Sequence, residues 1–167
     1  LLLKILKEHN IICTFFTTGY FAKNNPELIK NIIDMGHEIS SHSYYDKSLF
    51  LHKDKKSLSN DINKSIEILE KLVKSNILGF RAPQFSKNKY LFDVLQHNNI
   101  IYDSSTHPAF LPGKYIDFKS PLYPYVIRKG KNYILEIPCS VIPIFRFPIS
   151  WWWMRNIGLW LTVYGTK

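Results

Sequence analysis

The sequence has few cysteines, and none of them form a pair with metal-binding or redox spacing. Cys13 and Cys139 each lie in an apolar, strand-like run, which favours buried free thiols over a disulfide and slightly favours a cytoplasmic, reducing compartment. The sequence also lacks an uninterrupted run of about 18 apolar residues, so no transmembrane helix is predicted. The best candidate, residues 147–165, is interrupted by Arg155 and Asn156.

Acidic residues are scarce, since 13 Asp and Glu stand against 22 Lys and Arg, giving a net charge of +9. Such a chain can bind nucleic acid. Here, however, the lysines are mixed with Asn and Ser in segments 53–64, 71–76 and 87–89, as on exposed helix faces. We therefore expect a solvated surface and no nucleic-acid partner. Binding of an anionic polymer is a weaker alternative, for which we find no motif.

The composition is that of a folded protein, with 46% hydrophobic residues in a chain of 167, and we expect one domain over residues 1–167. The chain opens at Leu1 inside an apolar periodic run and closes on a strand-like segment that ends at Lys167. We therefore expect a partial domain, with further strands before Leu1 and after Lys167. The oligomeric state is not readable from the sequence.

Segments with strand and helix character alternate over the first 105 residues. The expected strands are residues 11–18, 37–41, 77–80 and 100–103, and the expected helices are residues 1–10, 25–36, 57–76 and 87–99. In the longest helix Ile62, Ile66, Leu69 and Val73 share one face. This alternation predicts an α/β fold with parallel strands covered by helices.

The pattern changes after Ser105. Residues 107–126 are rich in proline and aromatic residues, which predicts an ordered irregular loop. Residues 132–145 are expected to form one or two strands, broken at Pro138.

Polar residues gather where the four expected strands end. They are Thr17 and Thr18, Ser41 and His42, Arg81, and Asp103 with Ser104 and Ser105. The carboxyl ends of parallel strands meet at one edge of a sheet, where α/β proteins build their sites. The sequence therefore predicts a functional site at this edge.

His42 and Asp46 are spaced so that both can reach one ion. Residues four apart share a face where the chain turns helically, and imidazole and carboxylate are both accepted by zinc. A hydrogen-bonded histidine at a strand end and a loop or helix-capping aspartate are the alternatives. His37 and Glu38 open their strand and should lie at the opposite edge, with structural roles.

The remaining histidines are expected to lie outside the site. His52 precedes a charged run, His97 falls near a helix C-terminus, and His107 lies in the proline-rich loop, where it is expected to pack.

Four segments resemble one known family. Residues 14–49, TFFTTGYFAKNNPELIKNIIDMGHEISSHSYYDKSL, resemble the metal-binding region of polysaccharide deacetylases, the NodB-homology or carbohydrate esterase family 4 group. GFRAPQFS (79–86) is similar to the family's Arg-x-Pro motif, and YDSS (102–105) to the motif that follows it. Residues 134–150 are similar to the branch associated with exopolysaccharide export.

The resemblance implies a distorted parallel (β/α) barrel, here incomplete at both ends, and metal-dependent hydrolysis of N-acetyl groups on the amino sugars of a polysaccharide or oligosaccharide. It implies that His42 is a ligand of a divalent metal, zinc, and that Asp46 occupies the position of a second metal-binding histidine. It also implies that Arg81 orients a catalytic carboxylate and that Asp103 supports the site.

Aromatic residues are candidates for substrate binding. Phe85, Trp151 and Trp152 are suited to line a sugar groove, although aromatic side chains are equally common in cores.

The sequence departs from the family in three respects. The family's first motif, which carries the base and a metal ligand, would lie before Leu1, its general-acid histidine would lie beyond Lys167, and Asp46 replaces a histidine. We therefore expect the 167-residue chain alone to be inactive. The leading hypothesis is a carbohydrate N-deacetylase, and the alternative is a catalytically inactive glycan-binding relative with a degraded metal site.

Overall fold

The computed structural model describes residues 1–109, 117–143, 146–149, 155–156 and 163. Its helices are α1 (Leu2–Glu8), α2 (Gly19–Asn24), α3 (Pro26–Asp34), α4 (Lys55–Val73) and α5 (Leu91–His97), with short 3₁₀ turns η1 (Leu49–Leu51) and η2 (Pro83–Phe85). Its strands are β1 (Thr14–Thr17), β2 (Glu38–Ser41), β3 (Gly79–Phe80), β4 (Tyr102–Asp103), β5 (Tyr125–Lys129), β6 (Asn132–Glu136), β7 (Val141–Ile142) and β8 (Phe147–Pro148).

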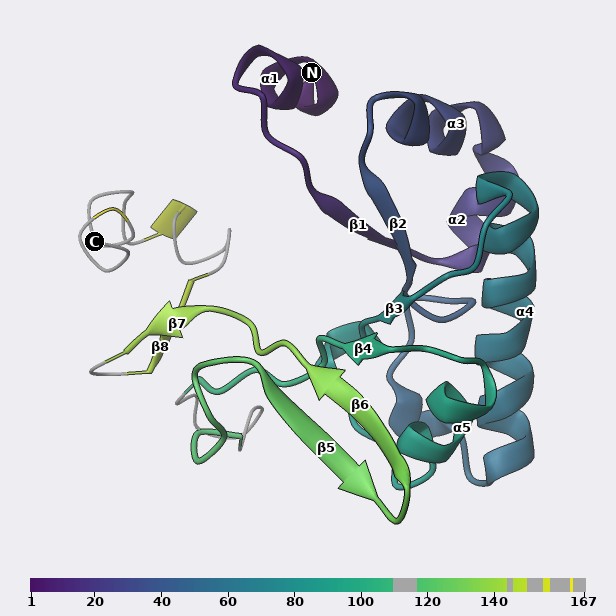
Figure 1. Cartoon of the computed structure of the whole chain (residues 1–167), viewed down its shortest axis with the longest axis vertical. Coiled ribbons are helices and arrows are strands. Elements are labelled where there is room, and N and C mark those ends of the chain that lie inside the picture. The colour runs from purple at the N-terminus through teal and green to yellow at the C-terminus, as the bar shows by residue number, and fades with distance from the viewer. Residues whose placement is uncertain (110–116, 144–145, 150–154, 157–162, 164–167) are drawn as a thin grey trace.

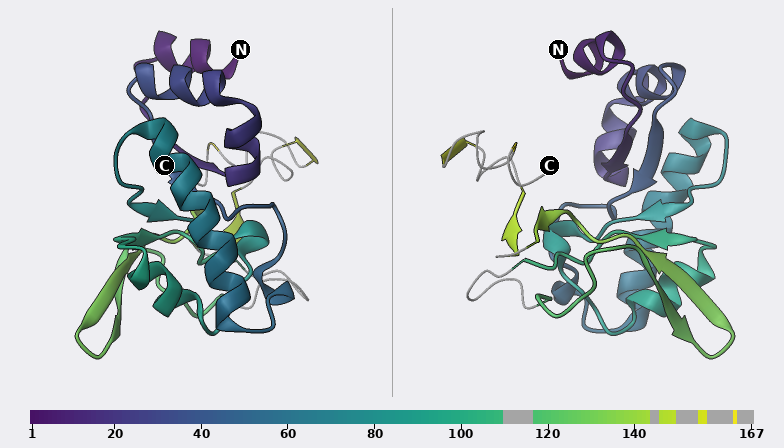
Figure 2. Two further views of the ribbon diagram at one scale, coloured as in Figure 1. Left: turned by 90° about the vertical axis from the view of Figure 1, so that its right-hand side faces the viewer. Right: turned by 60° about the vertical axis from the view of Figure 1, so that its left-hand side comes forward.

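Six of these strands form one sheet in the order β1-β2-β3-β4-β6-β5. The first five in that order are parallel, and β5 alone runs antiparallel, as the partner of β6 in a hairpin. Helices α2 to α5 lie on one side of the sheet (Figures 1 and 2). The described strands form an open sheet that does not close into a ring, as expected for an incomplete barrel.

Helix boundaries follow the local sequence. Asp54 caps α4 by accepting a hydrogen bond of 2.7 Å from the Ser57 backbone N–H, so this helix begins two residues before its predicted start. It ends where Lys74 turns left-handed at φ 58°. Pro26 occupies the first turn of α3, and Gly36 adopts φ 80° just after it, as the sequence predicts.

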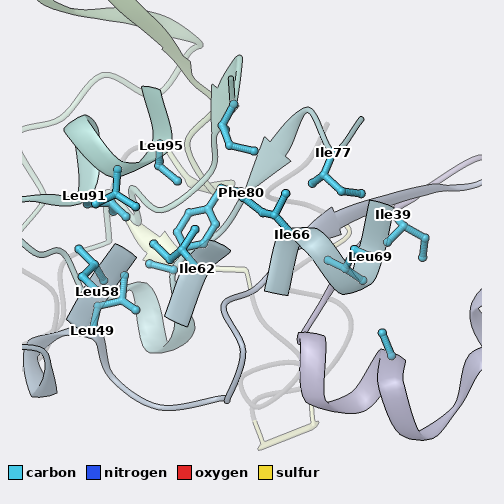
Figure 3. Packing of buried hydrophobic residues seen from close by; sticks show 14 of the residues in the cluster. Ile39, Leu49, Leu58, Ile62, Ile66, Leu69, Ile77, Phe80, Leu91 and Leu95 are labelled. Atoms are coloured by element: carbon cyan, nitrogen blue, oxygen red, sulfur yellow. The ribbon is translucent and has the colours of Figure 1, made fainter. Parts of the chain in front are cut away.

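The core lies between the helices and the sheet (Figure 3). Ile62, Ile66 and Leu69 of α4 are at most 4% exposed, and Val73 near the end of the helix is partly buried against the same cluster, which confirms the predicted apolar face. They are packed in one cluster with Ile39 of β2 and Phe80 of β3. Complete burial of such a side chain contributes about 1.5–3 kcal/mol each, so this layer fixes the strands against α4.

The opposite face of the same strands is polar. Glu38 accepts hydrogen bonds from the Thr14 hydroxyl at 2.6 Å and from the Tyr102 phenol at 2.8 Å, and Ser40 lies 2.8 Å from the same phenol. Burial, followed by the nearby Glu38, raises the pKa of Tyr102 to about 12. Gly79 makes room for this ring, because a Cβ there would lie 2.0 Å from it.

Two elements differ from the predicted pattern. The six-residue helix α2 was not predicted, and its first turn is capped by the Thr18 hydroxyl, which accepts from the Phe21 N–H at 3.2 Å. The end of the predicted loop, from Tyr125 onward, belongs to β5. The hairpin turns at Gly130, whose φ is 62°.

Both cysteines are free, as predicted, but full burial was a wrong expectation. Cys13 and Cys139 are half-buried because they lie just outside the regular strands, before β1 and between β6 and β7. In the part of the chain that the structure describes, no helix combines the length and apolar character needed to cross a membrane.

Candidate active site

One residue beyond each of three parallel strands continues the hydrogen-bonded ladder. His42, Arg81 and Ser104 donate their backbone N–H groups to carbonyls of the preceding strand at 3.0, 3.0 and 2.9 Å. The three residues therefore stand side by side along the carboxyl edge of the sheet. This is the edge at which the sequence predicted a site.

The orientation of His42 is set by the main chain of its neighbour. Its Nδ1 lies 2.7 Å from the Arg81 carbonyl oxygen. A carbonyl only accepts, so Nδ1 carries the proton and Nε2 of the neutral ring carries a lone pair. Burial lowers the pKa of His42, while the Arg81 carbonyl and the Asp46 carboxylate oppose that shift. The neutral ring, which is the metal-binding form, is thereby favoured.

His42 and Asp46 form a pair that fits part of a zinc site. His42 Nε2 lies 3.8 Å from Asp46 Oδ1. Two ligands of a tetrahedral zinc ion are about 3.3–3.4 Å apart, since each lies about 2.0–2.1 Å from the metal. Asp46 is 72% exposed and can close the difference by a change of rotamer. Within the described residues no third His, Cys, Asp or Glu joins them, so a zinc ion would need a further ligand from elsewhere.

Arg81 is held in place along its whole length. Its Nε donates to the Ser104 carbonyl at 3.0 Å, and its Nη2 donates to the Ser104 hydroxyl at 2.6 Å. The guanidinium carbon lies 4.1 Å from the centre of the Phe16 ring, a distance at which the cation is attracted to the ring face. The result is a fixed positive charge beside His42. Its predicted action on a catalytic carboxylate stays a prediction.

Asp103 lies on the other face of β4 from this row. Its carboxyl group is 6% exposed, accepts a hydrogen bond from the Ser105 hydroxyl and bonds to Glu136, which in turn accepts from the Thr106 N–H at 2.7 Å. Burial, and then the charge of Glu136, raise the pKa of Asp103 well above its ordinary value. Burial likewise raises the pKa of Glu136. The raised pKa values mean that this pair retains a proton at pH values at which an ordinary aspartate has lost it, and no described contact joins Asp103 to Arg81.

Ser104 was predicted only as one of the polar residues at the strand end, without a role of its own, and the structure places it in contact with Arg81. It lies in the same motif as Asp103, but side chains alternate between the two faces of a strand. Ser104 therefore shares a face with Tyr102 and meets Arg81, whereas Asp103 shares a face with Phe80. Because every second residue of a strand faces the same side, the position of Ser104 relative to Tyr102 would have placed it on the face of Arg81.

A hollow of about 520 Å³ lies over this edge. Its wall includes His42, Asp46, Arg81, Phe16, Gln84 and Phe85. A larger hollow of about 940 Å³, between α4, α5 and the start of β6, is lined by none of the strand-end residues, so size alone does not locate the site.

The predicted sugar-binding aromatics have different outcomes. Phe85 lines the hollow, and its ring is stacked on His107 with centroids 4.8 Å apart and planes 16° apart. Trp151 and Trp152 lie outside the described residues.

The other histidines are separate from the His42–Asp46 pair. His37 is buried at the start of β2, where its ring lies 5.3 Å from that of Phe15, in agreement with a structural role at the opposite edge. His97 ends α5, as predicted. His52 is half-buried beside η1, and its carbonyl accepts from the Asn88 side-chain amide at 3.1 Å.

The model of the family named polysaccharide deacetylase matches residues 1–102. The chain belongs to the polysaccharide deacetylase family. A curated relative from Helicobacter pylori (strain ATCC 700392 / 26695), named peptidoglycan deacetylase, is 28% identical over 151 residues, which cover 87% of this chain and 47% of the relative. The chain thus spans about half the length of this relative.

Solved structures of the polysaccharide deacetylase family show the same fold. A crystal structure from Mycobacterium smegmatis, described as that of a polysaccharide deacetylase, is 32% identical with a TM-score of 0.70, covering 84% of this chain and 45% of that one. A family 4 pseudoenzyme from Bacillus anthracis is 22% identical with a TM-score of 0.54, covering 59% and 35% of the two chains. The predicted fold class is therefore confirmed, whereas the exopolysaccharide-associated branch stays a prediction.

Proposed function

We propose that the full-length protein is a metal-dependent hydrolase that removes N-acetyl groups from the amino sugars of a polysaccharide or oligosaccharide. Membership of the polysaccharide deacetylase family supports the reaction class. The single observation that carries the metal dependence is the His42 ring, whose Nδ1–H is held by the Arg81 carbonyl so that Nε2 faces Asp46.

The residues at the sheet edge have distinct roles in this proposal. His42 and Asp46 supply two ligands of a divalent ion, zinc. When bound, such an ion polarises the acetyl carbonyl and lowers the pKa of a bound water. Arg81 presents a fixed cation that orients a carboxylate, and Asp103 supports the strand ends from behind. Phe85 lines the sugar site, and Trp151 and Trp152 are further candidates for it from the sequence alone.

The substrate class is proposed from the family and its named relatives. The Helicobacter pylori relative is named for peptidoglycan, and a relative from Sinorhizobium fredii (strain NBRC 101917 / NGR234) is named for chitooligosaccharide. Both names describe polymers or oligomers of amino sugars. The test therefore uses N-acetylchitotetraose, soluble peptidoglycan strands and a partly acetylated exopolysaccharide.

A catalytically inactive glycan-binding protein is the second candidate. Asp46 stands where the family motif has a histidine, and its carboxylate is exposed and 3.8 Å from His42 Nε2. The fold itself is compatible with loss of activity, since one structural neighbour is described as a pseudoenzyme.

Metal content and acetate release of the full-length protein separate the two candidates. The hydrolase predicts one zinc per chain and release of acetate from at least one of the three substrates. Asp46→Ala and His42→Ala should lose both, whereas Asp34→Ala, on an exposed helix surface, should keep both. Absence of stoichiometric zinc from the unmutated protein would overturn the metal site, and sugar binding without acetate release would establish the second candidate.

A further inference from the structure

The turn after Arg81 has an unusual backbone. Gln84 has φ 55° and ψ 22°, and Phe85 has φ 53°. Both residues lie in the left-handed region, which side-chain-bearing L-residues avoid because Cβ crowds the following carbonyl. Two consecutive residues of this kind outside glycine persist only where the surroundings impose them.

Contacts from separate segments impose this backbone. The Phe85 ring is stacked on His107 at 4.8 Å, which anchors the turn to the segment after β4. Ser86 donates its hydroxyl to the Pro83 carbonyl at 2.7 Å and accepts from the Leu49 N–H, also at 2.7 Å, which anchors the turn to η1. The neighbours of Gln84 are thus packed on both sides.

Gln84 itself is exposed and does not belong to the core. Its place is the wall of the hollow that also contains His42, Asp46 and Arg81. A glycine would adopt the same backbone without strain. The left-handed conformation therefore does not serve packing by this side chain, and it places Gln84 at the wall of the hollow.

We propose that Gln84 is a substrate-recognition residue, whose side-chain amide hydrogen-bonds a hydroxyl or acetamido group of the sugar bound in this hollow. The other polar side chains there are a cation, Arg81, two groups that accept, His42 Nε2 and the Asp46 carboxylate, and the Thr14 hydroxyl, whose proton is already donated to Glu38 at 2.6 Å. Gln84 adds a neutral group that both donates and accepts, which is what hydroxyl and acetamido groups need. This inference rests on the proposed deacetylase function.

Two pairs of variants of the full-length protein test the proposal. Gln84→Ala keeps the strained backbone and removes the amide, whereas Gln84→Gly removes both. Lys74→Ala and Lys74→Gly are matched controls, because Lys74 is exposed, has φ 58° and ends α4 away from the hollow. In each pair the glycine variant should unfold roughly 2–4 °C above the alanine variant.

Substrate measurements separate the two sites. Both Gln84 variants should raise KM about three- to tenfold for the acetylated substrate, N-acetylchitotetraose or peptidoglycan strands, because one hydrogen bond is lost. The Lys74 variants should leave KM unchanged. An unchanged KM in Gln84→Ala would overturn the recognition role while leaving the deacetylase intact. Failure of the unmutated protein to release acetate from any substrate would overturn the proposed function instead.

Discussion

Replacing Asp103 with asparagine should flatten the dependence of stability on pH. In the folded protein the carboxyl groups of Asp103 and Glu136 lie together, 6% and 1% exposed, with Ser105 and Thr106 as further hydrogen-bond partners. Burial and the charge of Glu136 raise the pKa of Asp103 well above its ordinary value. Asparagine would donate its amide N–H to Glu136 in place of the retained proton.

The sign of the effect follows from proton binding. Above about pH 4 the unfolded Asp103 has lost its proton, while the folded protein retains one between Asp103 and Glu136. The free energy of unfolding contributed by this pair is therefore greatest at low pH and falls as pH rises towards the folded pKa. One retained proton corresponds to a loss of at most about 1.4 kcal/mol per pH unit.

Urea unfolding at several pH values between about 4.5 and 7.5 measures this slope. The unmutated protein should lose stability with rising pH relative to Asp103→Asn, so that the difference between the two curves changes by up to about 1.4 kcal/mol per unit. Asp34→Asn, at an exposed position, is the control and should follow the unmutated protein. Parallel curves for the Asp103 variant and the unmutated protein would refute the retained proton.

Two further substitutions test the sheet. Gly79→Ala should lower the free energy of unfolding by about 2–4 kcal/mol, because the added Cβ would lie 2.0 Å from the Tyr102 ring and displace that ring from its hydrogen bonds. A decrease of less than about 0.5 kcal/mol in urea unfolding would contradict this packing. Arg81→Lys should lower the free energy of unfolding by about 1–3 kcal/mol in the same assay, because an ammonium group cannot reproduce the paired contacts of the guanidinium with Ser104. Arg128→Lys, at an exposed position of β5, is the control and should change the free energy of unfolding by no more than about 0.5 kcal/mol.

Long periodic segments were predictable because the signal is contained in the segment itself. Ile62, Ile66 and Leu69 repeat with helical spacing, and the structure buries all three. The helix α2 was missed because six residues are less than two turns and carry no full period. The hairpin was missed because prolines and aromatics dominate the preceding loop, although Gly130 between alternating residues signals a turn.

The contacts between residues of the candidate site could be predicted only in part from the sequence. The edge of the sheet followed from the order of strands, and His42 and Arg81 do lie side by side there. Asp103 and Ser104 are adjacent in sequence, so only the pleat decides which of them faces Arg81. The left-handed backbone at Gln84 is imposed by distant segments and leaves no local pattern.

The hydrogen bond that orients His42 ends on the main chain of Arg81. Side-chain replacements at position 81 therefore preserve the acceptor, because every amino acid has this carbonyl. A substitution at position 81 can therefore remove the positive charge without changing the orientation of the His42 imidazole. Selection can alter or abolish the cation while the histidine keeps its tautomer.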